Sequence, residues 1–333
     1  MTTDPSPDAE FPTSIGRQRR WAALLIPLLT LLILVYVGRQ HLGELDRLAA
    51  ASPQAIAAML VVFVLSRIVH ALVVTISLAK LDHTVGLGEM YLLTHIMSYT
   101  NLVLPRMGLS APALYLKHRH GVSYATCSSL LLPGLVLHVV SIGLVGLACQ
   151  ALLHVSQAGR ADLRITALFA AVLAAGVLAT VARVRIPDRW NGRIAGFFRR
   201  LMDAWGTLGS SWSLLGGILM LRVALIALNA VRLFIAFRAV GADVTFVGVF
   251  VSSLLAELTM IVSFTPAGLG LREAVVAFSA YMLNCTPATA LSAAVLDRIV
   301  MTVCIIAIAQ IGMWRLVRPL ARSRRATERA REE

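Results

Sequence analysis

Long apolar runs constrain this chain more than any other feature. Several of them reach the ~20 residues that an α-helix needs to cross a bilayer. Lipid offers no partner to backbone polar groups, so such runs predict helices, whose hydrogen bonds are internal. The chain is 58% hydrophobic and only 14% charged, whereas soluble proteins are about 25% charged. We therefore predict an all-α, polytopic helical membrane protein.

Six of the apolar runs are predicted to be full spans, and two further regions are apolar but interrupted. The first interrupted region, 88–118, is broken at Pro105 to Gly108, and the second, 244–284, at Pro266 to Gly270. At least one arm of each is too short to cross the bilayer, so we predict two re-entrant helical hairpins. The full spans are predicted at residues 21–38, 55–79, 122–152, 163–183, 213–238 and 287–313.

Positively charged segments predict how these spans are oriented. Arginines gather before the first span, after the fourth and after the sixth, and such loops are typically cytoplasmic. Six spans satisfy all three only if region 88–118 enters from the cytoplasm and region 244–284 from outside. We expect a cell inner or plasma membrane protein with both termini cytoplasmic. Its net charge of +13 then serves orientation and contact with anionic lipid, not nucleic acid.

This orientation makes residues 55–152 and 213–313 two units of opposite direction. Gly108-Leu109 in the first unit corresponds to Gly270-Leu271 in the second, and the prolines of the two breaks correspond at almost the same offset. Inverted repeats with broken helices are common in transporters, where the substrate site lies near the midplane. The alternative is two kinked helix pairs without a repeat.

The remaining segments complete the predicted organisation. Residues 1–20 are expected to be a disordered cytoplasmic N-terminus, 21–313 the transmembrane domain, and 314–333 a basic cytoplasmic tail. The connecting segment 153–212 contains an amphipathic pattern at 188–206 that predicts an interfacial helix, or a plain linker helix packed on the bundle. The four cysteines show no CxxC spacing, and we expect neither a metal nor another cofactor.

Ionisable residues inside the spans are the candidates for function, because charge at that depth is costly. Arginines outnumber acids there, and a guanidinium binds phosphate bidentately, which favours an anionic headgroup. The alternative is that acids and bases pair structurally and that Arg232 snorkels to an interface. His95 and His138 are expected to bond to a neighbouring carbonyl or hydroxyl. The predicted headgroup site is Arg67, Asn101, Arg106, Arg222, Gly268, Gly270, Arg272, Glu273 and Arg298, with Glu257, Asp297 and His70 as candidates for proton or ion coupling.

Two motifs resemble a known family. "FTPAGLGLRE" and "NLVLPRMGLSAPALYLKHRHGVSYATCSSLL" are similar to signatures of the lysylphosphatidylglycerol synthase transmembrane-region family, over roughly residues 55–313. That family includes the flippase half of multiple peptide resistance factor-type proteins. The resemblance implies movement of lipids or lipid-linked molecules between leaflets. Ala267 and Leu109 depart from the usual glycine and glutamate, and Ala113 stands near a usual arginine.

These observations predict a flippase-like transporter of an anionic phospholipid or a polyprenyl-phosphate-linked lipid. We find no catalytic constellation and no segment after Arg315 for an aminoacyl-transferase domain, so we expect no enzyme. Two alternatives stay open: an intramembrane transferase on a lipid-linked substrate, and a non-transporting partner of a lipid-modifying complex. Whether the protein forms a homo-oligomer is also open.

Overall fold

A computed structural model describes residues 51–103, 108–156, 162–181, 211–262 and 270–317. These residues form helices joined by turns, and five helices are long and apolar enough to cross a membrane. The all-α polytopic prediction is thus confirmed for the described part of the chain. The predicted first span at 21–38 and the amphipathic helix at 188–206 lie outside the described residues.

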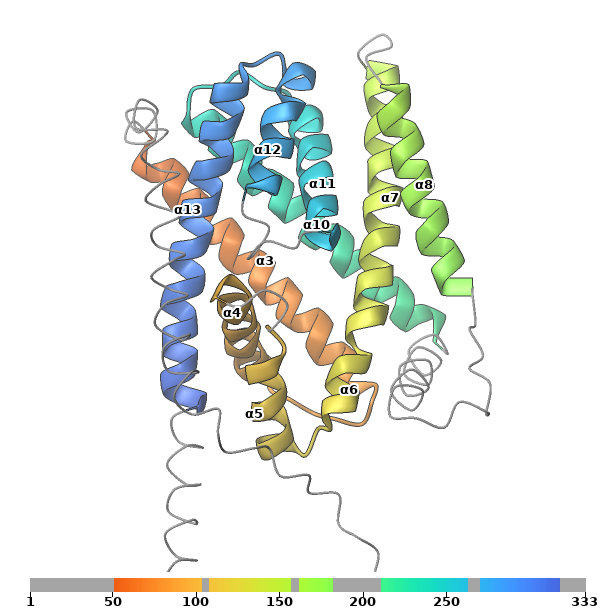
Figure 1. Ribbon diagram of the computed structural model, residues 1–333, viewed down its shortest axis with the longest axis vertical. Coiled ribbons are helices and arrows are strands. Elements are labelled where there is room, and N and C mark those ends of the chain that lie inside the picture. The colour runs from red at the N-terminus through yellow and green to blue at the C-terminus, as the bar shows by residue number, and fades with distance from the viewer. Residues whose placement is uncertain (1–50, 104–107, 157–161, 182–210, 263–269, 318–333) are drawn as a thin grey trace, which may run out of the picture. The chain divides into compact units, whose positions relative to one another are not determined.

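The helices follow the predicted spans closely (Figure 1). Predicted span 55–79 is α3, span 122–152 is α6 with α7, and the last span is α13 with a π-helical end. The described elements are α3 (Pro53–Ala79), α4 (Leu87–Val103), α5 (Ser110–His120), α6 (Tyr124–Ser129), α7 (Leu131–Ser156), α8 (Leu163–Val181), α10 (Trp212–Ala239), α11 (Phe246–Val262), α12 (Leu271–Phe278), η4 (Ser279–Leu283), α13 (Pro287–Gly312) and η5 (Met313–Val317).

Each interrupted region consists of separate described helices, and most residues of the predicted breaks, 104–107 and 263–269, lie outside the described residues. The first consists of α4 and α5, and the second of α11 followed by α12 and η4. The described helices of the longer arms, α4 and α11, have 17 residues each, or about 25 Å of helix. Their re-entry from opposite sides stays a prediction.

Turns and caps recur at corresponding places in the two halves. Helix α3 is followed by Asp82 in the left-handed region, and α10 by Gly241. Later, α5 ends at Gly121 and η4 at Asn284, both with positive φ. A hydroxyl cap opens the next helix in each half. When Gly108 is aligned with Gly270, the members of each pair fall within a few positions of each other.

Contacts between helices also have counterparts when the two halves are exchanged. If α3, α4 and α7 correspond to α10, α11 and α13, then the α3–α4 contact corresponds to α10–α11, and α4–α13 to α7–α11. The α3–α13 contact likewise corresponds to α7–α10, and α3 packs directly on α10. A two-fold relation requires such exchange, so these contacts support the predicted inverted repeat.

Helix α8 has no counterpart in this scheme among the described helices and packs along α7 (Figure 1). Glycines allow the two backbones to approach closely. A Cβ added to Gly143 would lie 2.6 Å from the backbone N of Leu173, and one added to Gly146 would lie 2.4 Å from the ring of Phe169. Small residues at such contacts are typical of helix association in lipid.

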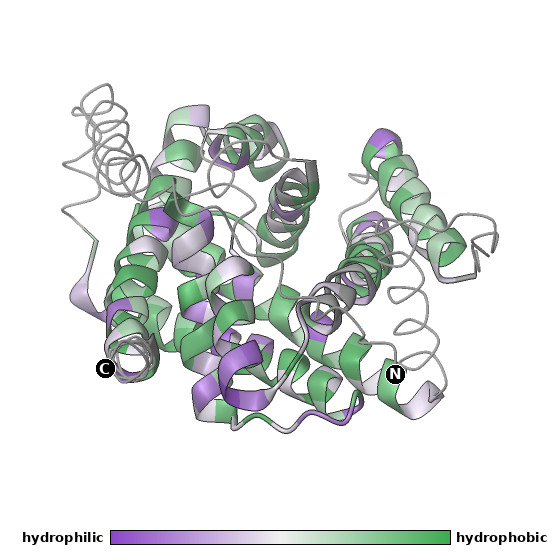
Figure 2. Cartoon of the chain, turned by 60° about the horizontal axis from the view of Figure 1, so that its bottom comes forward, coloured by the Kyte–Doolittle hydropathy of each residue, from purple (hydrophilic) through white to green (hydrophobic). Residues whose placement is uncertain are grey.

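The outer faces of the helices are apolar, as a lipid environment requires. Figure 2 shows hydrophobic residues along most of the long helices. On α3, for example, Leu60, Val61, Val64, Leu65 and Ile68 are exposed. The charged residues near the middle of the same helices are turned inward and build the site described next.

Candidate functional site

A cavity of about 240 Å³ lies among α3, α7, α10, α11, α12 and α13. It opens near the middle of α3, α10 and α13, at Arg67, Leu225 and Arg298. The position agrees with the midplane site predicted for broken-helix repeats. Its lining is Ser66, Arg67, His70, His138, Arg222, Leu225, Asn229, Arg232, Glu257, Arg272, Arg298 and Met301.

Asp297 holds two of the lining arginines. It is fully buried and accepts bonds from Arg232 Nε at 2.6 Å and from Arg272 Nη2 at 2.9 Å. Arg232 Nη2 reaches the second carboxylate oxygen at 3.4 Å. One carboxylate on α13 therefore ties α10 to the start of α12, and both guanidinium groups are fixed at the cavity wall.

Glu273 fixes the start of α12. Its Oε2 accepts the backbone N–H of Gly270 at 2.8 Å, and its Oε1 lies 3.6 Å from Arg298 Nε on α13. Gly270 has φ +85, a conformation that glycine adopts without a Cβ penalty. The break thus ends in a helix start held by an acid, as the helix dipole favours.

Glu257 on α11 forms a second polar chain along the cavity. It accepts from Asn229 Nδ2 at 2.8 Å and lies 3.2 Å from His138 Nε2 on α7. Asn229 Oδ1 in turn accepts from Arg232 Nη1 at 3.2 Å. Through Asn229 the His138–Glu257 pair is connected to the Arg232–Asp297 pair.

Two other lining arginines, Arg67 and Arg222, form no salt bridge with a described carboxylate, although Glu257 is near enough to Arg222 to attract it electrostatically. Arg67 donates to Ser98 Oγ at 3.1 Å, and its guanidinium lies 5.2 Å from the ring centroid of Phe63. Arg222 Nε is buried without a hydrogen-bond partner in the described part of the chain. Within the ranges that the structure describes, five arginines and three acids meet in or beside the cavity, so arginines exceed acids by two.

The same face of α3 and α10 lines the cavity. With Gly108 aligned to Gly270, Arg67 corresponds to Asn229 and His70 to Arg232, and all four line it. The cavity thus lies where the two predicted repeats meet, but the equivalent positions carry different chemistry.

A comparison with models of protein families identifies the family of this chain. The family model described as "Lysylphosphatidylglycerol synthase TM region" matches residues 20–309, which include both glycine-containing motifs. The chain belongs to that family. Neither the comparison with curated proteins nor the comparison with solved structures found a match.

Within this family member, the structure brings most of the predicted site residues together. The lining includes Arg67, His70, Arg222, Glu257, Arg272 and Arg298. Glu273 and Asp297 stand directly behind lining arginines, and Gly270 opens α12. Arg106 and Gly268 lie outside the described residues. Whether the assembled residues bind a headgroup stays a prediction.

Asn101 occupies a different place from the rest of the predicted set. It is not among the described residues that line the cavity, and its Oδ1 accepts the backbone N–H of Gly108 at 2.7 Å. It therefore closes the break between α4 and α5. A Cβ added to Gly108 would lie 2.3 Å from the Asn101 amide nitrogen, so this closure also requires glycine.

The structure also tests the predicted surroundings of Arg232, His138 and His95. The snorkelling of Arg232 is wrong, since the residue is 2% exposed and pairs with Asp297. His138 pairs with Glu257 and not with a carbonyl, whereas His95 does bond to the carbonyl of Tyr91 at 2.8 Å. The partners of Arg232 and His138 lie on other helices, and uniformly apolar spans carry little signal of which face turns inward.

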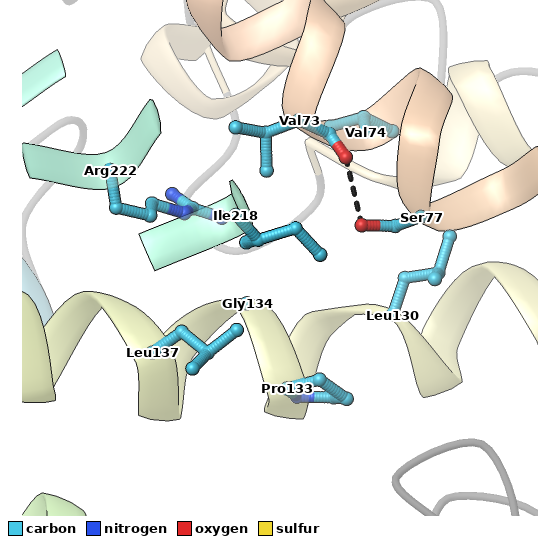
Figure 3. Close-up of a pocket in the computed structure, with 9 residues that line it drawn as sticks. All are labelled: Val73, Val74, Ser77, Leu130, Pro133, Gly134, Leu137, Ile218 and Arg222. Atoms are coloured by element: carbon cyan, nitrogen blue, oxygen red, sulfur yellow. Dashed lines mark hydrogen bonds between the residues drawn. The ribbon is translucent and has the colours of Figure 1, made fainter. Parts of the chain in front are cut away.

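A smaller pocket of about 40 Å³ shares Arg222 with the main cavity. Figure 3 shows it between α3, α7 and α10, with Arg222 at one end and Ser77 and Leu130 at the other. Its other lining residues are Val73, Val74, Pro133, Gly134, Leu137 and Ile218.

Proposed function

We propose that this protein is a flippase-like transporter that moves an anionic phospholipid or lipid-linked molecule between leaflets, with the headgroup held in the arginine-lined cavity. The observation that carries the proposal is the pair of cavity arginines, Arg67 and Arg222, that form no salt bridge in the described part of the chain. Charged side chains inside membrane spans are normally paired, so an anionic ligand would supply what the site lacks.

The size and surroundings of the cavity also support a headgroup ligand. Pockets for drug-sized ligands start at about 300 Å³, so about 240 Å³ suits a headgroup better than a whole lipid. Arg232 and Arg272 are already held by Asp297. They would shape the positive wall, while Arg67 and Arg222 stay available to bind phosphate oxygens.

The proposal also covers how the chain is oriented in the membrane and whether it catalyses a reaction. Both termini would be cytoplasmic in a cell inner or plasma membrane, and the chain would catalyse no covalent step. Membership of the family supports a role at the membrane with lipids as partners.

Leaflet exchange in proteoliposomes tests this function. Labelled anionic, zwitterionic and polyprenyl-phosphate lipids would be compared in wild type, Arg67→Ala and Arg222→Ala. Hydrogen bonds to charged groups contribute about 1.5–3 kcal/mol each. Each variant should therefore lose roughly tenfold or more in the exchange of one anionic class.

Arg238→Ala is the matched control, because Arg238 lies on the same helix as Arg222 but is exposed and pairs with Asp243. It should exchange lipid at the wild-type rate. Folded wild type that binds an anionic lipid without exchanging it would contradict transport and favour the non-transporting partner. Equal exchange by Arg222→Ala and wild type would place the headgroup elsewhere.

A further inference from the structure

The small pocket continues the arginine-lined cavity along the same three helices. On α3 the cavity is lined by Arg67 and His70, and the pocket by Val73 and Ser77, one and two turns later. On α10 the lining passes from Leu225 through Arg222 to Ile218. Arg222 lines both, so the two spaces adjoin at this residue.

The chemistry of the lining changes sharply at that meeting point. Among the described residues that line the small pocket, Arg222 is the one charged residue, and the other side chains are apolar apart from Ser77. The Ser77 hydroxyl donates to the carbonyl of Val73 at 2.8 Å, so it does not offer its proton to a ligand. A space of this kind favours hydrocarbon over a polar group.

We propose that the small pocket is a subsite for the hydrocarbon chain of the lipid whose headgroup occupies the arginine-lined cavity. This inference rests on the proposed function and adds the position of the chain. A lipid chain is covalently joined to its headgroup, so a headgroup at Arg222 needs an apolar path beside it. The small pocket is such a path, and its size of about 40 Å³ suits the few carbons next to the headgroup.

Gly134 on α7 keeps the junction open. A Cβ added there would lie 3.1 Å from Arg222 Nη2, closer than most such contacts allow. Figure 3 shows Gly134 facing the side of the pocket where Arg222 and Ile218 lie. A larger residue at this position would both displace the Arg222 guanidinium and narrow the pocket.

Two variants separate the chain subsite from the headgroup site. Ser77→Phe fills the end of the pocket away from Arg222, whereas Gly134→Val alters the junction itself. The matched control for the first is Thr180→Phe on α8, whose hydroxyl makes a similar bond within its helix at an exposed place. The control for the second is Gly217→Val on α10, where an added Cβ meets nothing within 4 Å.

The experiment measures binding of two probes to the purified full-length protein by native mass spectrometry. One probe is dioleoylphosphatidylglycerol and the other is glycerophosphoglycerol, which has the same headgroup without chains. We expect Ser77→Phe to lose most of its binding of the lipid and to keep that of the chain-free probe. Gly134→Val should lose both, and the two controls should match wild type.

The outcomes distinguish the two proposals. Wild-type binding of the lipid by folded Ser77→Phe would overturn the chain subsite. The headgroup site is tested separately, by whether Arg222→Ala loses binding of both probes. If wild type binds neither probe, the chain subsite for a phospholipid is overturned, while leaflet exchange of the polyprenyl-phosphate lipids still tests the proposed function separately. If Ser77→Phe loses both probes equally, the pocket belongs to the headgroup and the assignment to a chain is wrong.

Discussion

The two breaks in the broken helices meet the same backbone requirement in different ways. At the first, the neutral amide of Asn101 accepts the N–H of Gly108, and at the second, the carboxylate of Glu273 accepts the N–H of Gly270. The two glycines occupy corresponding positions in the two halves. A neutral bond is enough to close a break, so the charges at the second break require another explanation.

The surrounding positions show the same contrast. In the alignment that pairs Gly108 with Gly270, the first half has no charge where the second half has four charged residues. Ser110 and Ala111 correspond to Arg272 and Glu273, and Leu135 and Val136 correspond to Asp297 and Arg298. All four charged residues lie at or directly behind the cavity wall. Among the described residues, the positions that build the electrostatics of the cavity at the second break are therefore uncharged at the first.

Removing the charge of Asp297 should have the largest effect on this contrast. Asp297→Asn leaves Arg232 and Arg272 buried with no countercharge at that point. Breaking a buried ion pair costs about 3–5 kcal/mol, and thermal unfolding in detergent should show a loss of this size. Asp243→Asn, at an exposed pair with Arg238, should change the stability by less than about 1 kcal/mol. Similar losses in both variants would contradict the buried network.

The glycines give a smaller effect that separates the breaks by mechanism. Gly108→Ala collides with the Asn101 amide, which should cost about 1–3 kcal/mol as overpacking. Gly270→Ala meets no atom within 4 Å and instead forces φ +85 on alanine, which costs about 1–2 kcal/mol.

A double-mutant cycle tells the two mechanisms apart. Adding Asn101→Ala should relieve the collision, so Gly108→Ala should cost almost nothing in that background, measured again by thermal unfolding. Glu273→Ala should not rescue Gly270→Ala, because backbone strain does not depend on that side chain. Full additivity at the first break would contradict the steric explanation.

The smallest expected effect is a pH dependence of stability at the start of α4, where Glu89 is the acidic residue of the first hairpin. Glu89 bonds to Tyr115, and its Oε1 lies 2.9 Å from His120 Nε2. Partial burial raises the pKa of Glu89, but the bonds from His120 and Tyr115 outweigh it and hold the pKa below its usual value of 4.5. The ionised form therefore stabilises the fold fully above pH 4.5, and this stability is lost as the pH falls through the lowered pKa.

Hydrogen exchange of residues 110–120 at a series of pH values would measure this effect. Their protection should decrease below pH 4.5 in wild type, while Glu89→Gln should show weaker protection with less dependence on pH. A decrease of equal size in both would assign the pH dependence to another group.

Sequence alone predicted the helices well because hydropathy and breaks act locally. Gly270, for example, marked the start of the arm that the structure describes as α12. The central positions of Arg67 and Arg222 in their spans also predicted their place at the cavity. Pairings could not be predicted in the same way, since Arg232 and Asp297 are far apart in the chain and meet only when α10 packs on α13.

The close packing of α7 on α8 has a consequence for motion. Leu173 and Phe169 fill the space above Gly143 and Gly146, so sliding one helix past the other would bring their atoms into collision. Helix α7 also carries His138 and Gly134 at the cavity and its junction. Any opening of the cavity on that side should therefore move α7 and α8 together as one rigid body, with the exposed face of α8 against the surrounding lipid.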